Sequence, residues 1–381
     1  MPAGDKDKGT ARYGRQRGLG RLRRANLKEG ARSGGWERLP EDAEAFERLG
    51  DRERRTHAGE RLLARFNRLV ALGQFAEREG EAAEVCEVRP GRVVVRFADG
   101  REEPAAIRRA LEKRISGVRN TLAVGDRVRV VREAQDLAIV GIEPRRNQLA
   151  RSDAHNRALE HVLAANVDRL VVCAAVREPE FKPGFVDRAL LMAAAHDVPA
   201  LLVVTKRDLG DAAPWVELYR GLGYPCLAVD ARCAEDPGVR ALAALLAGAA
   251  CVFAGQSGVG KSSLVNACFP GANARIGAVA EEGFGRHTTT AARSYVLPGG
   301  GRLIDTPGIR ECVIRGLLPL DVALLFPDLA RWQPLCRYRD CTHRQEPGCA
   351  VQAALARGEI APTRYASYRS IIDEDLAEHA S

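Results

Sequence analysis

A glycine-rich segment, GQSGVGKS at residues 255–262, has the residue types and spacing of a phosphate-binding loop. It matches G-x-x-x-x-G-K-S/T and lies between an apolar run at 251–254, expected to be a strand, and a helix expected from Lys261. In such a loop backbone amides surround phosphate oxygens, the lysine reaches the β- and γ-phosphates, and the final hydroxyl binds Mg²⁺. We predict that Lys261 is catalytic and Ser262 binds Mg²⁺. The predicted nucleotide contacts here are Gly255, Gln256, Ser257, Gly258, Val259, Gly260, Lys261, Ser262 and Ser263.

A second motif, Asp305-Thr306-Pro307-Gly308, follows an apolar run at 302–304 that we expect to be a strand. An aspartate at such a strand end binds the metal, usually through water, and the glycine amide can contact the γ-phosphate. D-x-x-G alone is a weak signal, but its position after a phosphate loop makes it specific. We predict that Asp305 joins Ser262 in holding Mg²⁺ and that Gly308 contacts the nucleotide.

Between these two motifs lies a threonine-rich segment, GRHTTT at 285–290. A threonine here can complete the Mg²⁺ shell only when a γ-phosphate is present, which would make the segment a switch; the alternative is a surface loop with turn-forming threonines. We predict catalytic roles for Thr289 and Thr290. Ras-like enzymes follow D-x-x-G with a glutamine that orients water, and here that position is Ile309. His287 or a group supplied in trans is then needed, although His287 could equally be a structural loop residue.

The residues Thr205-Lys206-Arg207-Asp208 resemble the guanine-selecting motif N-K-x-D. The aspartate carboxylate accepts hydrogen bonds from two guanine donors that adenine lacks, so a buried unpaired carboxylate would reject adenine. Thr205 stands where asparagine is usual, and the Lys206 stem should lie along the base. We therefore predict GTP contacts from Thr205, Lys206 and Asp208.

The order of the motifs is reversed, because the guanine motif precedes the phosphate loop along the chain. The same sheet can form if the usual chain is cut after D-x-x-G and rejoined elsewhere, which is a circular permutation. The segment after Gly308 then leads directly into the C-terminal region, which could couple nucleotide state to the position of that region.

Four candidate metal ligands lie within residues 336–349: Cys336, Cys341, His343 and Cys349. Three thiolates and an imidazole are the ligand set of a closed structural zinc site, although free thiols are the alternative. We predict one structural Zn²⁺. The other cysteines are scattered and are expected to be core thiols: Cys86, Cys173, Cys226, Cys233, Cys251, Cys268 and Cys312.

The elements that must position these motifs alternate between strand and helix. Apolar runs at 170–175, 200–204, 225–229 and 251–254 are separated by helical segments at 186–196, 215–222 and 239–246, which predicts a parallel sheet covered on both faces. Short strands at 92–97, 124–131 and 137–142 predict a small β-barrel of the oligonucleotide-binding (OB) type. Segments 351–356 and 365–375 are expected to be helices beside the zinc loop.

Arginines recur on the predicted barrel strands, where they suit either a nucleic-acid backbone or an ordinary solvated face. They are Arg92, Arg96, Arg127, Arg129 and Arg132. Of the net charge of +8, a surplus of seven falls in residues 1–35, a basic arm that cannot bury a core. The arm is either a nucleic-acid-binding tail or a dispensable extension.

The chain of 381 residues is long enough for several domains. It shows neither a secretion signal nor an apolar run long enough for a bilayer, so we expect a cytoplasmic monomer with no membrane partner. The predicted divisions are a disordered arm at 1–60, a helical lead-in at 61–82, an OB-type barrel at 83–148, a circularly permuted P-loop GTPase α/β domain at 152–315, and a small, mostly helical zinc-binding domain at 316–381.

From about residue 83 onward, the chain closely resembles the ribosome small-subunit-dependent GTPase A family of circularly permuted GTPases. The resemblance is carried by TKRD at 205–208, GQSGVGKSS at 255–263, GRHTTT at 285–290, DTPG at 305–308 and CRYRDCTHRQEPGC at 336–349. It departs from the family at Asp230-Ala231, where the family tends to have Ser-Ala behind the guanine, and in its basic arm.

The resemblance implies a GTP hydrolase that acts in the cytoplasm on the small (30S) ribosomal subunit and its rRNA. It implies a late maturation factor with weak intrinsic activity, stimulated by that subunit, that couples GTP hydrolysis to GDP with release or a conformational checkpoint. Two other interpretations are a P-loop ATPase or kinase acting on a small molecule, which Asp208 disfavours, and a non-catalytic RNA-binding scaffold.

Overall fold

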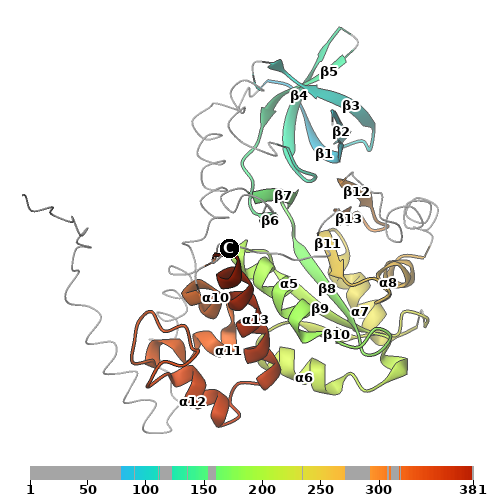
Figure 1. The fold of residues 1–381 in the computed structure, drawn as a ribbon. Coiled ribbons are helices and arrows are strands. Elements are labelled where there is room, and N and C mark those ends of the chain that lie inside the picture. The colour runs from blue at the N-terminus through green and yellow to red at the C-terminus, as the bar shows by residue number, and fades with distance from the viewer. Residues whose placement is uncertain are drawn as a thin grey trace, which may run out of the picture.

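The strands of the N-terminal barrel and of the α/β unit join edge to edge in one eleven-stranded sheet, in the order β10-β9-β8-β11-β13-β12-β1-β2-β3-β5-β4 (Figure 1). The computed structural model describes residues 79–89, 91–109, 111, 122–134, 136–152, 160–233, 235–270, 292–306, 309, 317 and 319–379. The predicted arm and nearly all of the predicted helical lead-in lie outside these ranges.

The barrel contains the five strands that follow the start of the described chain. They are β1 (Glu81–Arg89), β2 (Arg92–Phe97), β3 (Glu102–Ile107), β4 (Arg127–Glu133) and β5 (Asp136–Ile142). Pairing of β1 with β4 closes the barrel, and β3 and β5 are its parallel neighbours. Alternate strand residues point inward, so Val85, Val95, Val128 and Ile139 fill the interior. The OB-type barrel predicted from the sequence is confirmed.

Strand β1 pairs first with a barrel strand and then with a strand of the α/β unit. Its first half, Glu81 to Glu84, pairs with β4 inside the barrel. The register then shifts between Val85 and Glu87, and the second half pairs with β12 (Ala292–Val296), the outer strand of the α/β unit. A bulge bends a strand and changes its twist, which allows one strand to leave the barrel and continue the neighbouring sheet.

The α/β unit alternates strands and helices as predicted. Its elements are β8 (Arg169–Ala175), α5 (Pro183–Ala195), β9 (Ala200–Thr205), α6 (Ala213–Gly221), β10 (Cys226–Ala228), α7 (Pro237–Leu246), β11 (Ala250–Gly255), α8 (Lys261–Cys268), β12 and β13 (Arg302–Asp305). The bounds of the elements predicted between residues 170 and 254 are shifted by at most three residues. Antiparallel β12 pairs with β13, whereas the other five strands pair in parallel.

Both faces of this sheet are buried. On β8, alternate side chains enter one of two apolar clusters: Leu170, Val172 and Ala174 lie with residues of α5 and α6, whereas Val171, Cys173 and Ala175 lie with residues of α7 and α8. Continuous apolar runs such as LVVCAA are therefore required, because each strand has no solvated side.

A hairpin and a buried ion pair connect the barrel to this unit. The hairpin is β6 (Gln148–Ser152) with β7 (Glu160–Ala165), which the sequence patterns did not reveal. Arg145 donates to both carboxylate oxygens of Asp126, at 2.7 and 2.8 Å, and both side chains are almost fully buried. At Gly125, a Cβ atom would lie 2.1 Å from the Ala165 carbonyl oxygen, so only glycine permits this approach of the barrel to β7.

The C-terminal region is mostly helical and packs against α5 (Figure 1). It contains α10 (Pro319–Leu325), α11 (Pro327–Ala330), a 3₁₀ turn (Gln333–Leu335), α12 (Ala350–Ala356) and α13 (Pro362–His379). Leu191 and Ala195 of α5 share one apolar cluster with this region. None of the helices in the described part of the chain is both long and apolar enough to cross a membrane.

A buried arginine network joins α13 to the α/β unit. Arg364 on α13 donates to Asp187 of α5 at 2.5 Å and to Asp328 of α11 at 2.9 and 3.1 Å. The Tyr219 hydroxyl of α6 donates to the same Asp187 carboxylate at 2.7 Å. The guanidinium also lies over the Phe326 ring. The buried guanidinium therefore has carboxylate partners on two helices, as it needs, because an unpaired buried charge is strongly disfavoured.

Candidate nucleotide-binding site and zinc centre

The predicted nucleotide motifs gather at one edge of the sheet, where parallel strands end. Thr205 ends β9 and is followed by residues 206–208, and Asp230 follows β10. The glycine-rich loop begins at the last residue of β11, and Asp305 ends β13. Strand β8 lies between β9 and β11. In open α/β sheets, ligands bind at the carboxyl ends of the strands, so the reversed chain order still brings these loops to one place.

The glycine-rich loop has a backbone that requires its glycines. Gly260 caps α8 with φ of +89°, in the left-handed region that side chains rarely adopt. A Cβ at Gly255 would lie 2.7 Å from the Cys173 carbonyl oxygen of β8. The loop therefore lies tightly against the neighbouring strand and leads directly into the α8 N-terminus, a favourable site for anions.

Lys261 is the first residue of α8, and its side chain turns back over the loop. Its ammonium donates to the carbonyl oxygens of Gly255 and Gln256, both at 2.8 Å, and the residue is 7% exposed. These contacts hold the charge inside the loop, where a phosphate would lie. Ser262 follows on the first turn of α8 and is partly buried.

Thr205 joins the base motif to the phosphate loop. Its hydroxyl lies 2.6 Å from the Val259 carbonyl oxygen and 3.3 Å from the Ala174 carbonyl oxygen. Thr205 and Val259 are both buried, and the Thr205 hydroxyl supplies the donor that a buried carbonyl such as that of Val259 needs. The hydroxyl at position 205 thus makes the connection between the two loops, although it replaces the expected asparagine. Sequence reasoning identified the position but not this contact.

Asp208 lies in a short 3₁₀ turn and is paired with an arginine that the sequence patterns did not single out. Arg232 lies 2.6 Å from its carboxylate and 3.2 Å from that of Asp230. Both carboxylates therefore share one cation. Hydrogen bonds from Arg232 lower the pKa of Asp230. Lys206 has φ of +54°, and its ammonium donates to the Glu178 carbonyl.

Two described residues follow Asp305 closely in the chain, Thr306 and Ile309, and both are buried. Thr306 is buried, and its hydroxyl has no hydrogen-bond partner among the described residues. Ile309 is 5% exposed and belongs to the apolar cluster on the α5 side of the sheet, so its side chain serves the core. The predicted switch residues His287, Thr289 and Thr290, and also Gly308, lie outside the described residues.

The four predicted zinc ligands come together in the C-terminal region. Their ligand atoms all lie within 4.8 Å of one another, and all four residues are buried: Cys336, Cys341, His343 and Cys349. Tetrahedral zinc, with Zn–S of about 2.3 Å and Zn–N of about 2.0 Å, requires S–S and S–N separations of about 3.8 and 3.6 Å. Cys336 and Cys349 sulfurs lie 3.9 Å apart, and each lies 3.5–3.6 Å from His343 Nδ1. The cluster therefore fits zinc.

Backbone and side-chain contacts prepare this cluster for a cation. The Cys336 sulfur accepts from the Ala350 amide at 3.3 Å, and hydrogen bonding with Cys349 lowers the pKa of Cys336 to about 4. His343 has φ of +60°, a strained backbone for a non-glycine residue, of the kind often found at functional sites. Thiolate character at Cys336 is what a metal ligand needs.

A carboxylate orders the loop between Cys341 and Cys349. Glu346 accepts from the amides of Thr342, Arg344 and Gln345 at 2.7–3.0 Å. Burial alone would raise the pKa of Glu346, but hydrogen bonds from Thr342 and the loop amides lower it to about 2. The loop that carries His343 and connects Cys341 to Cys349 therefore has its own internal support.

The remaining cysteines agree with the prediction of core thiols except at one described position. Cys86, Cys173, Cys226, Cys251 and Cys268 are buried, as expected. Cys233 is exposed, and the prediction was wrong there, because the residue lies in the turn after β10 rather than in a strand. Cys312 lies outside the described residues.

Comparison with known proteins identifies relatives over most of the chain. The family model described as RsgA GTPase matches residues 142–315. A "small ribosomal subunit biogenesis GTPase RsgA" from Porphyromonas gingivalis is 39% identical over 300 residues, 75% of this chain and 94% of the relative. A protein of the same name from Azotobacter vinelandii is 44% identical over 241 residues, 61% of this chain and 69% of that relative.

Two solved structures share the fold. YjeQ from Thermotoga maritima is 27% identical with a TM-score of 0.61, over 78% of this chain and 98% of that one. YloQ, described as a circularly permuted GTPase, is 23% identical with a TM-score of 0.57, over 79% and 96% of the two chains. The reversed order of loops around one sheet edge agrees with these similarities, and the chain therefore belongs to the RsgA family of circularly permuted GTPases, which hydrolyse GTP.

Proposed function

We propose that this chain binds the small ribosomal subunit and its rRNA and acts as a late maturation factor. In this proposal, GTP hydrolysis drives release from the subunit or a conformational checkpoint, and the protein works as a monomer in the cytoplasm. The observation that carries the proposal is the gathering of the base motif, the phosphate loop and Asp305 at one sheet edge, in a chain whose relatives are named small ribosomal subunit biogenesis GTPases.

The phosphate loop would bind the β- and γ-phosphates through its amides and Lys261. The ammonium already lies within the loop, held by two carbonyl oxygens, and can exchange these neutral acceptors for charged phosphate oxygens, which bind it more strongly. Thr205 supports the geometry by bonding the Val259 carbonyl. The segment containing Thr289, Thr290 and His287 is proposed as the part that responds to the γ-phosphate.

Guanine would be selected by Asp208. Its carboxylate is paired with Arg232, so the guanine donors must share or displace this guanidinium. Asp230 is a second acceptor for the same arginine, and it can hold the arginine while Asp208 accepts from the base. Lys206 would contribute its stem to the base. The change from the family's Ser-Ala to Asp230-Ala231 would then provide a second carboxylate that holds Arg232 beside the base.

Two metals are part of this proposal. Ser262 and Asp305 would hold Mg²⁺, which neutralises developing phosphate charge when bound; hydroxyl and carboxylate oxygens suit this hard cation. Zn²⁺ would be held by Cys336, Cys341, His343 and Cys349, and its closed ligand set indicates a structural role.

The test is the rate of GTP hydrolysis with and without purified small ribosomal subunits, with ATP in parallel. We expect the small subunit to stimulate GTP hydrolysis and the large subunit not to. ATP should neither be hydrolysed nor compete with GTP for binding. Lys261→Ala and Ser262→Ala should abolish hydrolysis. Asp208→Asn should weaken GTP binding and admit xanthine nucleotides. A rate unchanged by small subunits would refute the proposed partner, and equal affinities for GTP and ATP would refute the guanine assignment.

A further inference from the structure

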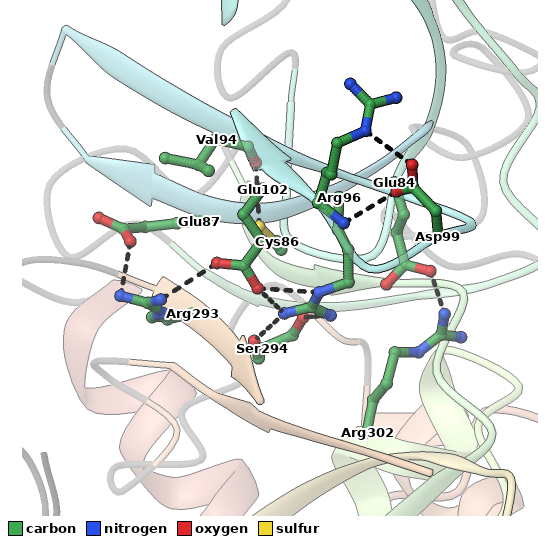
Figure 2. Close-up of polar contacts among 11 residues, drawn as sticks. Glu84, Cys86, Glu87, Val94, Arg96, Asp99, Glu102, Arg293, Ser294 and Arg302 are labelled. Carbon is green, nitrogen blue, oxygen red and sulfur yellow. Dashed lines mark hydrogen bonds and ion pairs between the residues drawn. The ribbon is translucent and has the colours of Figure 1, made fainter. Parts of the chain in front are cut away.

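The barrel contacts the α/β unit through charged side chains arranged around the β1–β12 pairing (Figure 2). Glu87 is opposite Arg293, and Val88 is opposite Ala292. On its other edge β12 pairs with β13, with Arg293 opposite Asp305. One residue of β12 therefore lies between the barrel and the carboxylate proposed to hold Mg²⁺.

Arg293 is bound by two barrel carboxylates. Its guanidinium lies 3.1 Å from Glu87 and 3.2 Å from Glu102. The Glu87 side chain is only 7% exposed, so its charge is compensated almost entirely by protein groups. Glu87 also pairs with the more exposed Arg89 at the end of β1, so this carboxylate connects β1 to β12.

Arg96 of β2 binds the next residue of β12. Its guanidinium donates to the Ser294 carbonyl at 2.7 Å and to the Ser294 hydroxyl at 3.1 Å, and it also pairs with Glu102 at 2.8 Å. Its side chain is 10% exposed. Arg96 is thus an interdomain contact in this structure, rather than a free cation on a solvated barrel face.

A third contact reaches β13 itself. Glu84 of β1 forms an ion pair with Arg302, the first residue of β13, and Asp305 is the last. Burial raises the pKa of Glu84 despite the neighbouring arginines. The barrel therefore touches β13 both directly and through β12, so a displacement of the barrel would be transmitted to both ends of this four-residue strand.

We propose that Glu84, Glu87 and Glu102 of the barrel are positioning residues that hold β12 and β13 so that Asp305 is placed for Mg²⁺ beside the nucleotide. This inference rests on the proposed Mg²⁺ role of Asp305. The barrel, as the N-terminal module, is then part of the scaffold of the hydrolytic site.

The test measures release of a fluorescent GDP from the full chain as a function of Mg²⁺ concentration, because bound Mg²⁺ retards release. Glu84→Gln and the double variant Glu87→Gln/Glu102→Gln should raise the half-maximal Mg²⁺ concentration about tenfold, which is the lower end of the loss in metal affinity when a group that orients a metal ligand is removed. GDP affinity in EDTA should be unchanged, because the phosphate loop and Asp208 lie on other strands. Arg101→Gln is the control and should match the wild type, because it removes the ion pairs of Arg101 with Glu81, Asp99 and Glu103, which all lie within the barrel.

Asp305→Asn separates the two levels of the proposal. If Asp305→Asn shifts the Mg²⁺ dependence and the glutamate variants do not, the positioning role is refuted while the Mg²⁺ site stands. If Asp305→Asn leaves the Mg²⁺ dependence of GDP release unchanged, the proposed Mg²⁺ role of Asp305 is refuted, and the positioning role falls with it. If a glutamate variant also loses GDP affinity in EDTA, the charge exchange Glu84→Arg/Arg302→Glu is compared with the single variant Arg302→Glu. A half-maximal Mg²⁺ concentration closer to the wild-type value in the exchange variant supports the inference. An equal value in the two variants overturns it.

Discussion

Replacement of Arg364 by methionine tests how the C-terminal helix is held on the α/β unit. Methionine keeps much of the apolar volume over Phe326 but removes a guanidinium that serves Asp187 and Asp328. Both Arg364 and Asp187 side chains are 1% exposed or less. Two buried carboxylates would lose their cation, and breaking a buried pair in this way costs about 3–5 kcal/mol.

The assay is urea unfolding followed by tryptophan fluorescence, compared at the midpoint of the transition because a chain of several domains need not unfold in one step. Arg357→Met is the matched control: its pair with Glu359 is exposed on both sides, and such pairs contribute about 0–1 kcal/mol. The double variant Arg364→Met/Asp187→Asn should recover part of the lost stability, because it removes one of the stranded charges.

The pH dependence of this defect has a defined sign. Burial raises the pKa of Asp187 even in the presence of Arg364. Without the arginine the pKa of Asp187 rises further. Because the folded-state pKa of Asp187 then lies above its unfolded value, the ionised carboxylate destabilises the fold at neutral pH. The deficit of Arg364→Met should therefore shrink as pH falls through the raised pKa. A deficit no larger than that of Arg357→Met, or one that does not respond to Asp187→Asn, would refute the reasoning.

Three further predictions concern the site. Thr205→Val should weaken GDP binding about tenfold, because the Val259 carbonyl loses its donor, whereas Thr205→Ser should not; titration of fluorescent GDP checks both. Cys341→Ser should lower bound zinc, measured by elemental analysis, from one equivalent to near none, whereas Cys233→Ser should retain it. Glu346→Gln should lower thermal stability at pH 7 and less so in acid: the folded pKa of about 2 lies below the ordinary 4.5, so the stabilisation is present above pH 4.5 and is lost toward pH 2.

The sequence was most informative where its signals were local. The apolar run at 251–254 is the interior of β11, and α8 begins at Lys261 as predicted. A strand buried on both faces has to be continuously apolar, and a phosphate loop has to carry glycine at fixed positions, so both are visible without knowledge of their neighbours. The four zinc ligands were visible for the same reason.

Strands with one polar side were harder to predict. β1 and β3 were missed, and so was β12. On β3 the burial alternates between exposed and half-buried positions, and the strand contains a proline. β12 carries the interdomain residues Arg293 and Ser294, whose partners lie some two hundred positions away. Pairings of that sequence separation leave no periodic signal, so the connection between barrel and site could not be inferred from the sequence.

The partners of the arginines were likewise beyond sequence reasoning. Arg129 and Arg132 of the barrel pair with Glu143 and Glu103, and Arg96 faces the α/β unit. Arg96 therefore does not lie on a solvated barrel face, whereas Arg129 and Arg132 are 36% and 51% exposed beside their carboxylate partners, and their place on a nucleic-acid surface stays a prediction. Coupling of nucleotide state to the C-terminal region stays a prediction, but the Arg364 network requires that any such movement carry α5 with it or break a buried pair.

The Arg364 network also has a consequence for the order of synthesis. Asp187 is made 177 residues before Arg364, so a growing chain can complete β8, α5 and β9 long before the cation that permits burial of this carboxylate exists. Until the last helix is made, the α5 face that it covers is exposed to water. A chain terminated before position 364 would expose that apolar face together with Asp187, which is the kind of unfinished surface that chaperones and proteases act on.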